Sequence, residues 1–146
     1  MVMAGYIAIM YVTQGFAFGP YQIRIATALY ALAALFSFLV VPLAIANAMS
    51  NFFFGTLGVL DVLGGLIVGI ITAGTVWGIV KARLPRIFIV LPIVLGPGLI
   101  VPIWLSQILG LPYTLLVVQL SIGQIVPGVV GYLLVQTLSK RGENRI

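Results

Sequence analysis

The sequence predicts an all-α integral membrane protein, a bundle of six transmembrane helices, and three observations support this class. Hydrophobic residues make up 62% of the 146 positions, and the mean hydropathy is +1.28. Charged residues make up only 6%, whereas ordinary soluble domains are about 25% charged. A soluble chain of this size would leave much of that apolar surface in water. The apolar runs are also continuous rather than alternating in polarity, which favours helices over a membrane β-barrel.

Glycines, prolines and polar clusters divide the chain into apolar segments. We expect one transmembrane domain over residues 1–146, with helices at about 2–13, 22–36, 38–53, 60–80, 87–109 and 112–138. The first segment lacks a basic start and an A-x-A cleavage site, so we expect a retained helix instead of a signal peptide. The loop QGFAFGPYQ ends it.

The second and third helices are separated because residues 22–53 are too long for one span at about 1.5 Å per residue. A single span from Ile25 to Ala46, kinked at Pro42, is the open alternative. FGTLGVL leads into the fourth helix, and the basic loop KARLPR separates it from the fifth. A tight turn at Gly110 follows, and the sixth helix begins at Pro112, a favoured first-turn position for proline.

Positive charge gathers in two places and predicts the orientation. Basic loops stay cytoplasmic, so both termini are expected in the cytoplasm of a multi-pass cell-membrane protein. The loops after the first, third and fifth helices then face outward. This rule does not choose between five and six helices. The basic residues that carry the prediction are Lys81, Arg83 and Arg86 in one loop and Lys140, Arg141 and Arg145 in the tail.

The composition also excludes several kinds of chemistry. The chain has no cysteine and no histidine, which excludes disulfides, Cys/His metal sites and histidine acid–base chemistry. Asp61 and Glu143 are its two acidic residues, so no carboxylate pair is available for hydrolysis or proton relay. We expect no enzyme activity, cofactor, metal or nucleic-acid partner. An energy source for active transport would have to lie on another polypeptide.

Polar side chains gather at the predicted outer level of the bundle. Polar groups in membrane helices are costly and usually face the bundle interior or a cavity. The cluster therefore suggests a site loaded from outside. Its candidate ligand-binding members are Gln22 and Arg24, Asn47 and Asn51 one helical turn apart, and Gln119 and Gln124.

Each of these candidates has a structural alternative. Arg24 is either a ligand contact, an anchor that snorkels to the interface, or the partner of Asp61 in an ion pair. For Asp61 itself we expect a structural role, offsetting the dipole at the start of its helix. Asn47 and Asn51 offer donor and acceptor groups that suit the edge of a heterocycle, but asparagines also bond neighbouring membrane helices.

Small residues and prolines carry further expectations. Glycines of the fourth helix predict close helix packing, and prolines of the fifth predict a bend that lines a cavity. Ala4 and Ala8 form a small-x-x-x-small step on the first helix, a candidate surface for docking another membrane protein.

The stretch FGPYQIRIATAL resembles the QueT family, the substrate-binding S-components of energy-coupling factor (ECF) transporters linked to queuosine precursors. ANAMSNFFFGTLGVLDVLGG resembles a second signature of that family. The resemblance implies six helices, an outward-facing pocket, a small heterocyclic solute, and partnership with a transmembrane coupling protein and two ATPase subunits. Thr27 stands where the family carries a glutamate, and it joins the ligand-binding candidates. Pro97 and Gln124 replace a family asparagine and glutamate.

We therefore expect a substrate-binding subunit of an ECF-type importer. The alternative is a structural or assembly subunit of a larger membrane complex, in which the polar residues only bond neighbouring helices. A passive channel would need a polar path through the whole bundle.

Overall fold

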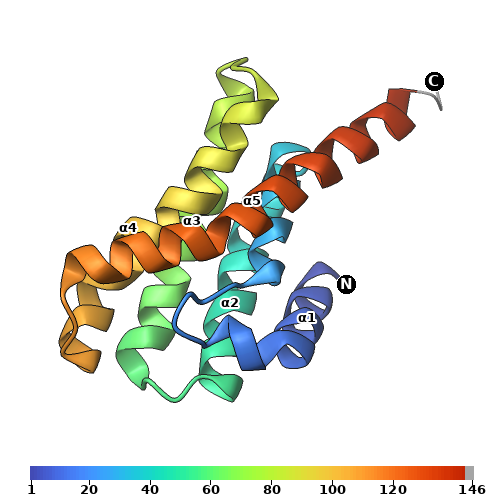
Figure 1. Ribbon diagram of the computed structural model, residues 1–146. Coiled ribbons are helices and arrows are strands. Elements are labelled where there is room, and N and C mark those ends of the chain that lie inside the picture. The colour runs from blue at the N-terminus through green and yellow to red at the C-terminus, as the bar shows by residue number, and fades with distance from the viewer. Residues whose placement is uncertain (144–146) are drawn as a thin grey trace.

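The computed structural model describes residues 1–143, and this part of the chain is entirely helical apart from its connections (Figure 1). The expected helical membrane-protein class is confirmed. Arg145, one of the predicted basic tail residues, lies outside the described residues. The six helices are α1 (Val2–Ala17), η1 (Ile25–Ala34), α2 (Val40–Phe54), α3 (Val59–Lys81), α4 (Val90–Leu109) and α5 (Tyr113–Glu143), with short 3₁₀ turns η2 (Ser37–Leu39) and η3 (Arg86–Ile89) before α2 and α4.

Within the described residues, four segments are long and apolar enough to cross a membrane. They are Ser37–Phe54, Val59–Lys81, Arg86–Leu109 and Tyr113–Gly142. Two shorter apolar helices, α1 and η1, complete the bundle. The side chains on the outer faces of these helices are mostly large and apolar, as contact with lipid requires.

The second helix differs most from its prediction. It begins at Ile25 instead of Gln22 and is a ten-residue 3₁₀ helix. Gln22 has a left-handed φ of 43°, and Arg24 has φ −96° and ψ 87°, so neither backbone is helical. At about 2.0 Å per residue, η1 is only about 20 Å long. The residues before it therefore enter the bundle as non-helical chain.

The second and third helices are separate, so the alternative of one kinked span is wrong. Phe36 is extended, with φ −135° and ψ 90°, and this breaks the helix between η1 and η2. Pro42 lies in the first turn of α2, where its missing N–H would have no helical partner anyway. The proline therefore starts a helix and does not kink one.

The remaining boundaries differ at their ends. α1 continues to Ala17, past the expected end at residue 13, and α5 continues to Glu143, past residue 138. Lysine and arginine are good helix formers, and the end of α5 contains them. The expected fifth helix begins with the 3₁₀ turn η3, and α4 proper starts at Val90.

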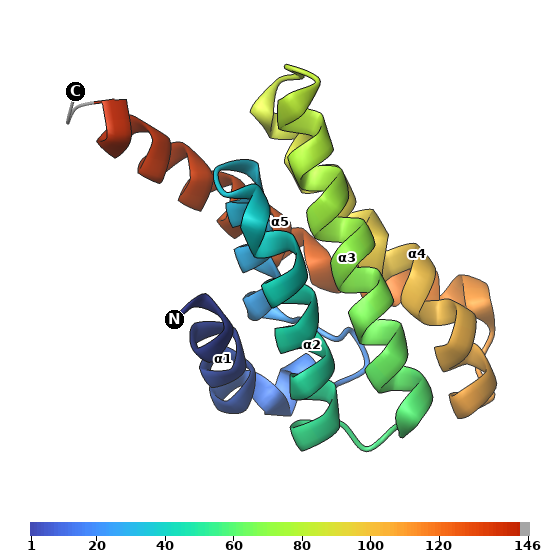
Figure 2. The ribbon, with the colours of Figure 1, turned by 180° about the vertical axis from the view of Figure 1, so that it is seen from behind.

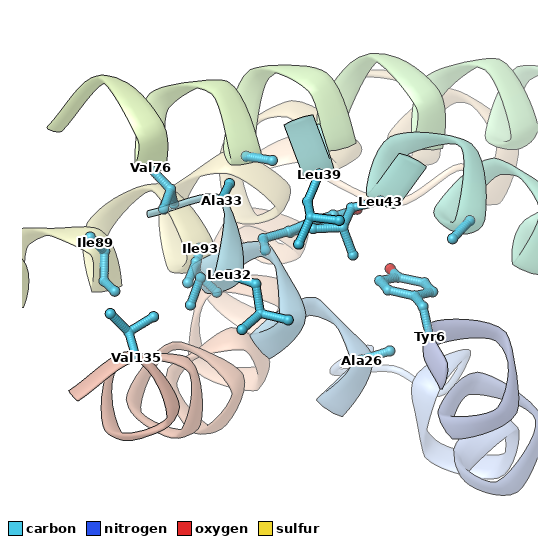
Figure 3. Packing of buried hydrophobic residues seen from close by; sticks show 14 of the residues in the cluster. Tyr6, Ala26, Leu32, Ala33, Leu39, Leu43, Val76, Ile89, Ile93 and Val135 are labelled. Atoms are coloured by element: carbon cyan, nitrogen blue, oxygen red, sulfur yellow. The ribbon is translucent and has the colours of Figure 1, made fainter. Parts of the chain in front are cut away.

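η1 occupies the interior of the bundle. It contacts α1, α3 and α5, while α2 packs on α3 and α4 packs on α5 (Figures 1 and 2). α5 crosses the other helices obliquely, and its last turns extend beyond them. Figure 3 shows the apolar core around η1, to which every helix contributes; labelled members include Tyr6, Leu32, Leu43, Ile93 and Val135.

Close packing of α2 on α3 depends on glycine, as the small-residue pattern predicts. A Cβ on Gly69 would lie 2.6 Å from the Cα of Ala44, which is closer than real Cβ contacts. Gly74 and Gly78, farther along the same helix, have open space in this direction. The glycines of the predicted small face are therefore used for close packing over the first half of α3.

The two ends of the bundle differ in chemistry. The loops after α1, α2 and α4 lie at one end, and the α3–α4 loop and the end of α5 lie toward the other (Figure 1). Arg86 Nη1 donates to Ser139 Oγ at 2.6 Å and connects the basic loop to α5. The end opposite to these basic residues contains the polar cluster.

Candidate functional site

The site is built on a non-helical segment, residues 18–24, between α1 and η1, of which Gln22 and Arg24 are buried. Its backbone N–H groups find partners nearby: Gln22 N–H donates to Gly19 O at 3.1 Å, and Ile23 N–H donates to Phe16 O at 3.1 Å. Gln22 and Arg24 are 6% and 5% exposed. Irregular backbone at membrane depth is tolerated only where protein buries it or where it lines a cavity. Gln22 and Arg24 meet both conditions, because they are buried and line a cavity.

Side chains from η1 and α5 hold the segment in place. Gln124 Nε2 donates to Gln22 O at 2.9 Å. The Thr27 hydroxyl lies 2.7 Å from Arg24 O and 2.7 Å from Gln124 Oε1, and it donates to one of them at a time. One amide on α5 thus bonds both the segment and the helix that follows it.

Arg24 lies at the centre of the cluster. Its Nη1 donates to Asn47 Oδ1 at 3.1 Å and to Asn51 Oδ1 at 3.0 Å. Nε donates to Ala17 O at 3.4 Å, and the guanidinium lies 4.9 Å from the centre of the Phe18 ring. A buried side chain with these partners is not an interfacial anchor, so the snorkelling alternative is wrong.

The two asparagines orient Arg24. While each accepts from the arginine, Asn47 Nδ2 donates to Gly65 O at 2.9 Å and Asn51 Nδ2 donates to Asp61 O at 2.9 Å. Both ends of each amide are therefore engaged with the protein. Gly65 is required beside them, because a Cβ at that position would lie 2.6 Å from Asn51 Nδ2.

Asp61 lies beside this network and is 2% exposed. It sits in the first turn of α3, as expected for a residue that offsets the helix dipole. Trp104 Nε1 donates to its Oδ1 at 3.2 Å, and its Oδ2 is buried with no hydrogen-bond partner. Arg24 donates to the two asparagines, and Asp61 accepts from Trp104. The Arg24–Asp61 ion pair is therefore not formed.

Two cavities lie at this end of the bundle. The inner one is about 10 Å³, which is room for about one water molecule. The outer one is about 370 Å³ and half open, within the usual size range of small-molecule sites. Gln22 lines both. The inner cavity is lined by polar side chains of Gln22, Arg24, Thr27, Asn47, Asn51, Asp61, Trp104 and Gln124.

Six of the seven ligand-binding candidates therefore line one cavity. Gln119 is the exception, and it lines the outer pocket instead. The docking candidates Ala4 and Ala8 are exposed on α1, away from both cavities. Pro97 of α4 lines the inner cavity, in agreement with the expectation that the proline-containing helix lines a cavity.

Two members of the site did not follow from sequence reasoning. Trp104 was not singled out, and Asp61 was assigned a purely structural role. The signal that points to Trp104 is its indole N–H, which needs a partner inside a membrane bundle. Asp61 is the one acidic residue within a predicted helix, and that rarity favours function over helix capping.

The contacts bear on both hypotheses about function. Asn47 and Gln124 bond neighbouring elements, as expected of an assembly subunit. The outer pocket with Gln22 and Gln119 is the feature expected of a solute-binding subunit.

Comparison with known proteins adds one finding. The protein-family model described as QueT transporter matches residues 1–140. The match includes the non-helical segment 18–24 and the polar stretch of α5. Comparison with curated proteins and with solved structures gives no match.

Proposed function

Because the chain belongs to the QueT transporter family and is thus a membrane transport protein, we propose that it is the substrate-binding subunit of an ECF-type importer. The solute is a small heterocycle, either a queuosine precursor or a related micronutrient. The subunit captures it in a pocket that faces outward. The family match agrees with the resemblance found in the sequence.

The observation that carries this proposal is a pair of cavities that share Gln22 in their walls. The outer pocket is large enough to receive a small molecule, and the buried polar cluster lies directly behind Gln22. A purely structural bundle has no need of an open pocket that leads to a buried arginine. Ligand sites in membrane bundles typically combine apolar walls with a few convergent polar groups.

The orientation follows from the charges. Lys81, Arg83 and Arg86 lie at the α3–α4 loop, at the end opposite the pocket. The positive-inside rule places this loop in the cytoplasm. The outer pocket then opens to the exterior of the cell membrane, which suits uptake.

The structure suggests how the solute enters. The inner cavity holds about one water molecule, so a heterocycle enters only after the segment 18–24 shifts. Gln22 has a φ of 43°, a conformation that costs a non-glycine residue of the order of 1–3 kcal/mol. This residue is the natural hinge. Its release from Gln124 would join the two cavities.

The charges of the inner cavity favour a solute without net charge. Arg24 and Asp61 carry opposite formal charges, and Thr27 and Gln124 are neutral. The family carries glutamates where this chain has Thr27 and Gln124. A neutral heterocycle that offers both hydrogen-bond donors and acceptors matches this set, whereas a strongly charged solute would leave a buried charge uncompensated.

The energy for import comes from partners, a transmembrane coupling protein and two ATPase subunits. Ala4 and Ala8 are exposed on α1, and Gly15 on the same helix has open space around it. Small residues let another helix approach closely in a membrane. We assign this face of α1 to the coupling protein.

The test is a binding measurement on the purified protein in lipid nanodiscs. Titration calorimetry with 7-deazaguanine and mass spectrometry of retained small molecules should both detect a bound solute. Gln124→Leu should abolish binding, because it removes the bonds to Gln22 and Thr27. Gln136→Leu is the matched control, since Gln136 lies on the same helix and bonds only to Tyr132.

Co-expression with coupling and ATPase subunits completes the test. If the chain retains no solute, does not bind 7-deazaguanine and does not co-purify with ATPases, the proposal is wrong. Stable co-purification with other membrane proteins, without solute, would support the assembly-subunit alternative. That alternative draws on the hydrogen bonds that Asn47 and Gln124 make within the bundle.

A further inference from the structure

We infer that Asp61 is the specificity-determining residue of this site and accepts a hydrogen bond from an amino group of the solute. The inference rests on the proposed function, because it assigns a role within the same pocket. It replaces the structural role expected for Asp61 from the sequence.

The amide side chains of Asn47, Asn51 and Gln124, which line the inner cavity, are engaged with the protein. Asn47 and Asn51 each accept from Arg24 and donate to a backbone carbonyl. Gln124 accepts from Thr27 and donates to Gln22 O. These residues build and orient the cavity. The oxygen of each amide has a hydrogen-bond donor within reach, in contrast to one oxygen of Asp61.

Asp61 differs because one of its carboxylate oxygens is free. Oδ1 accepts from Trp104, but Oδ2 is buried and has no partner among the described residues. The side chain is 2% exposed and lines the inner cavity. A buried acceptor without a partner is costly, and a charged one more so. The site is therefore incomplete until a donor arrives.

Four other buried oxygens in the described chain lack partners, and each differs from Asp61. They belong to hydroxyl groups, which are neutral, and none of these residues lines the inner cavity; they are Tyr6, Tyr30, Thr72 and Ser121. Asp61 combines formal charge, burial and a position on the cavity wall. That combination indicates a ligand contact.

The position of Trp104 defines the kind of donor. The indole holds one carboxylate oxygen and lines the same cavity, which leaves little room beside the other oxygen. Gly64 allows this arrangement, because a Cβ there would overlap the Trp104 ring. A donor that projects from the edge of a heterocycle reaches Oδ2 more easily than a ring N–H. We therefore assign the contact to an amino group.

The experiment combines a protein change with a solute change. Titration calorimetry compares 7-deazaguanine with 7-deazahypoxanthine, which lacks the amino group, on the wild type and on Asp61→Asn. The wild type should prefer 7-deazaguanine by about 10- to 100-fold, the range for a hydrogen bond to a charged group. In Asp61→Asn, Trp104 can still donate to the side-chain oxygen, so the amide nitrogen takes the place of Oδ2. A nitrogen that donates cannot accept from the amino group, and this variant should therefore bind both solutes about equally.

Thr72→Val is the matched control. It also alters a buried polar residue of α3 with an unpaired oxygen, but outside the cavity, so its preference should equal that of the wild type. If Asp61→Asn fails to fold in the nanodisc, Asp61→Ser replaces it under the same criteria.

The outcomes separate this inference from the proposed function. A wild type that binds neither solute overturns the proposed function and this contact with it. A wild type that binds both equally overturns the contact alone. The contact is also overturned if Asp61→Asn keeps the preference for 7-deazaguanine, or if this variant folds and binds neither solute.

Discussion

Replacement of Gly65 by alanine should dismantle the polar cluster from the side of α3. The new Cβ would lie 2.6 Å from Asn51 Nδ2 and 3.4 Å from Asn47 Nδ2. Ordinary contacts of this kind are 3.4 Å or longer. Asn51 must therefore move by nearly 1 Å. It is held by Arg24 on one side and by Asp61 O on the other, so the movement strains or breaks both hydrogen bonds.

The magnitude follows from those two bonds. The bond from Arg24 to Asn51 involves a charged donor and is worth about 1.5–3 kcal/mol, and the bond to Asp61 O is worth about 1 kcal/mol. Alanine returns about 1 kcal/mol through its higher helix propensity. Gly65→Ala should therefore lower the free energy of unfolding by about 1.5–3 kcal/mol and weaken solute binding at least tenfold.

The assay is equilibrium unfolding in mixed detergent micelles, followed by binding calorimetry in nanodiscs. Gly74→Ala is the matched control, because its Cβ would enter open space on the same helix. It should be neutral or stabilising by about 0.4–1 kcal/mol. If Gly65→Ala proves as stable as Gly74→Ala and binds solute normally, the close approach of α3 to the asparagines is not what orders Arg24.

Three further changes have specific expected results. Gly64→Ala should displace the Trp104 ring and shift its fluorescence emission, measured in a background where the other tryptophan is replaced by phenylalanine; unchanged emission would contradict the packing. Gln124→Leu should release the segment 18–24 and raise its amide hydrogen exchange by at least tenfold, because the bond to Gln22 O is lost; unaltered protection would show that α5 does not hold the segment. Ala8→Phe should abolish co-purification with the coupling protein without changing unfolding, since the side chain is exposed; intact co-purification would assign the docking surface elsewhere.

The sequence predicts the ends of α3 and α4 well. α3 and α4 end within about one residue of the expected positions because strong local signals stand there: a basic loop after Lys81 and a glycine at position 110. Gly110 adopts φ 66°, which glycine accepts without strain. A turn can therefore be located from the sequence when the residues within the turn themselves favour it.

The earlier half of the fold depends on contacts that no local pattern contains. The delayed start of η1 at Ile25 results from the bonds that Gln22 and Arg24 make with α2 and α5. Partners up to 102 positions away decide the conformation of these residues. The apolar run after them reads as an ordinary helix, and nothing in it marks a 3₁₀ geometry.

The candidate site shows the same division. Polarity inside apolar helices was enough to select five residues that the fold brings to one cavity, and the family resemblance added Thr27. It could not tell which of them face a solute and which orient a neighbour. That distinction depends on where each amide points, and for Asp61 on a single unpaired oxygen.

The bonds that Gln124 makes with Gln22 and Thr27 also bear on how the protein is made. The segment 18–24 leaves the ribosome early, but the side chain that closes its backbone lies near the end of the chain. Until α5 is inserted, the carbonyl of Gln22 must find water or another donor at membrane depth. The pocket is therefore the last part of the molecule to form. A truncated or stalled chain would have most of its helices but no finished site.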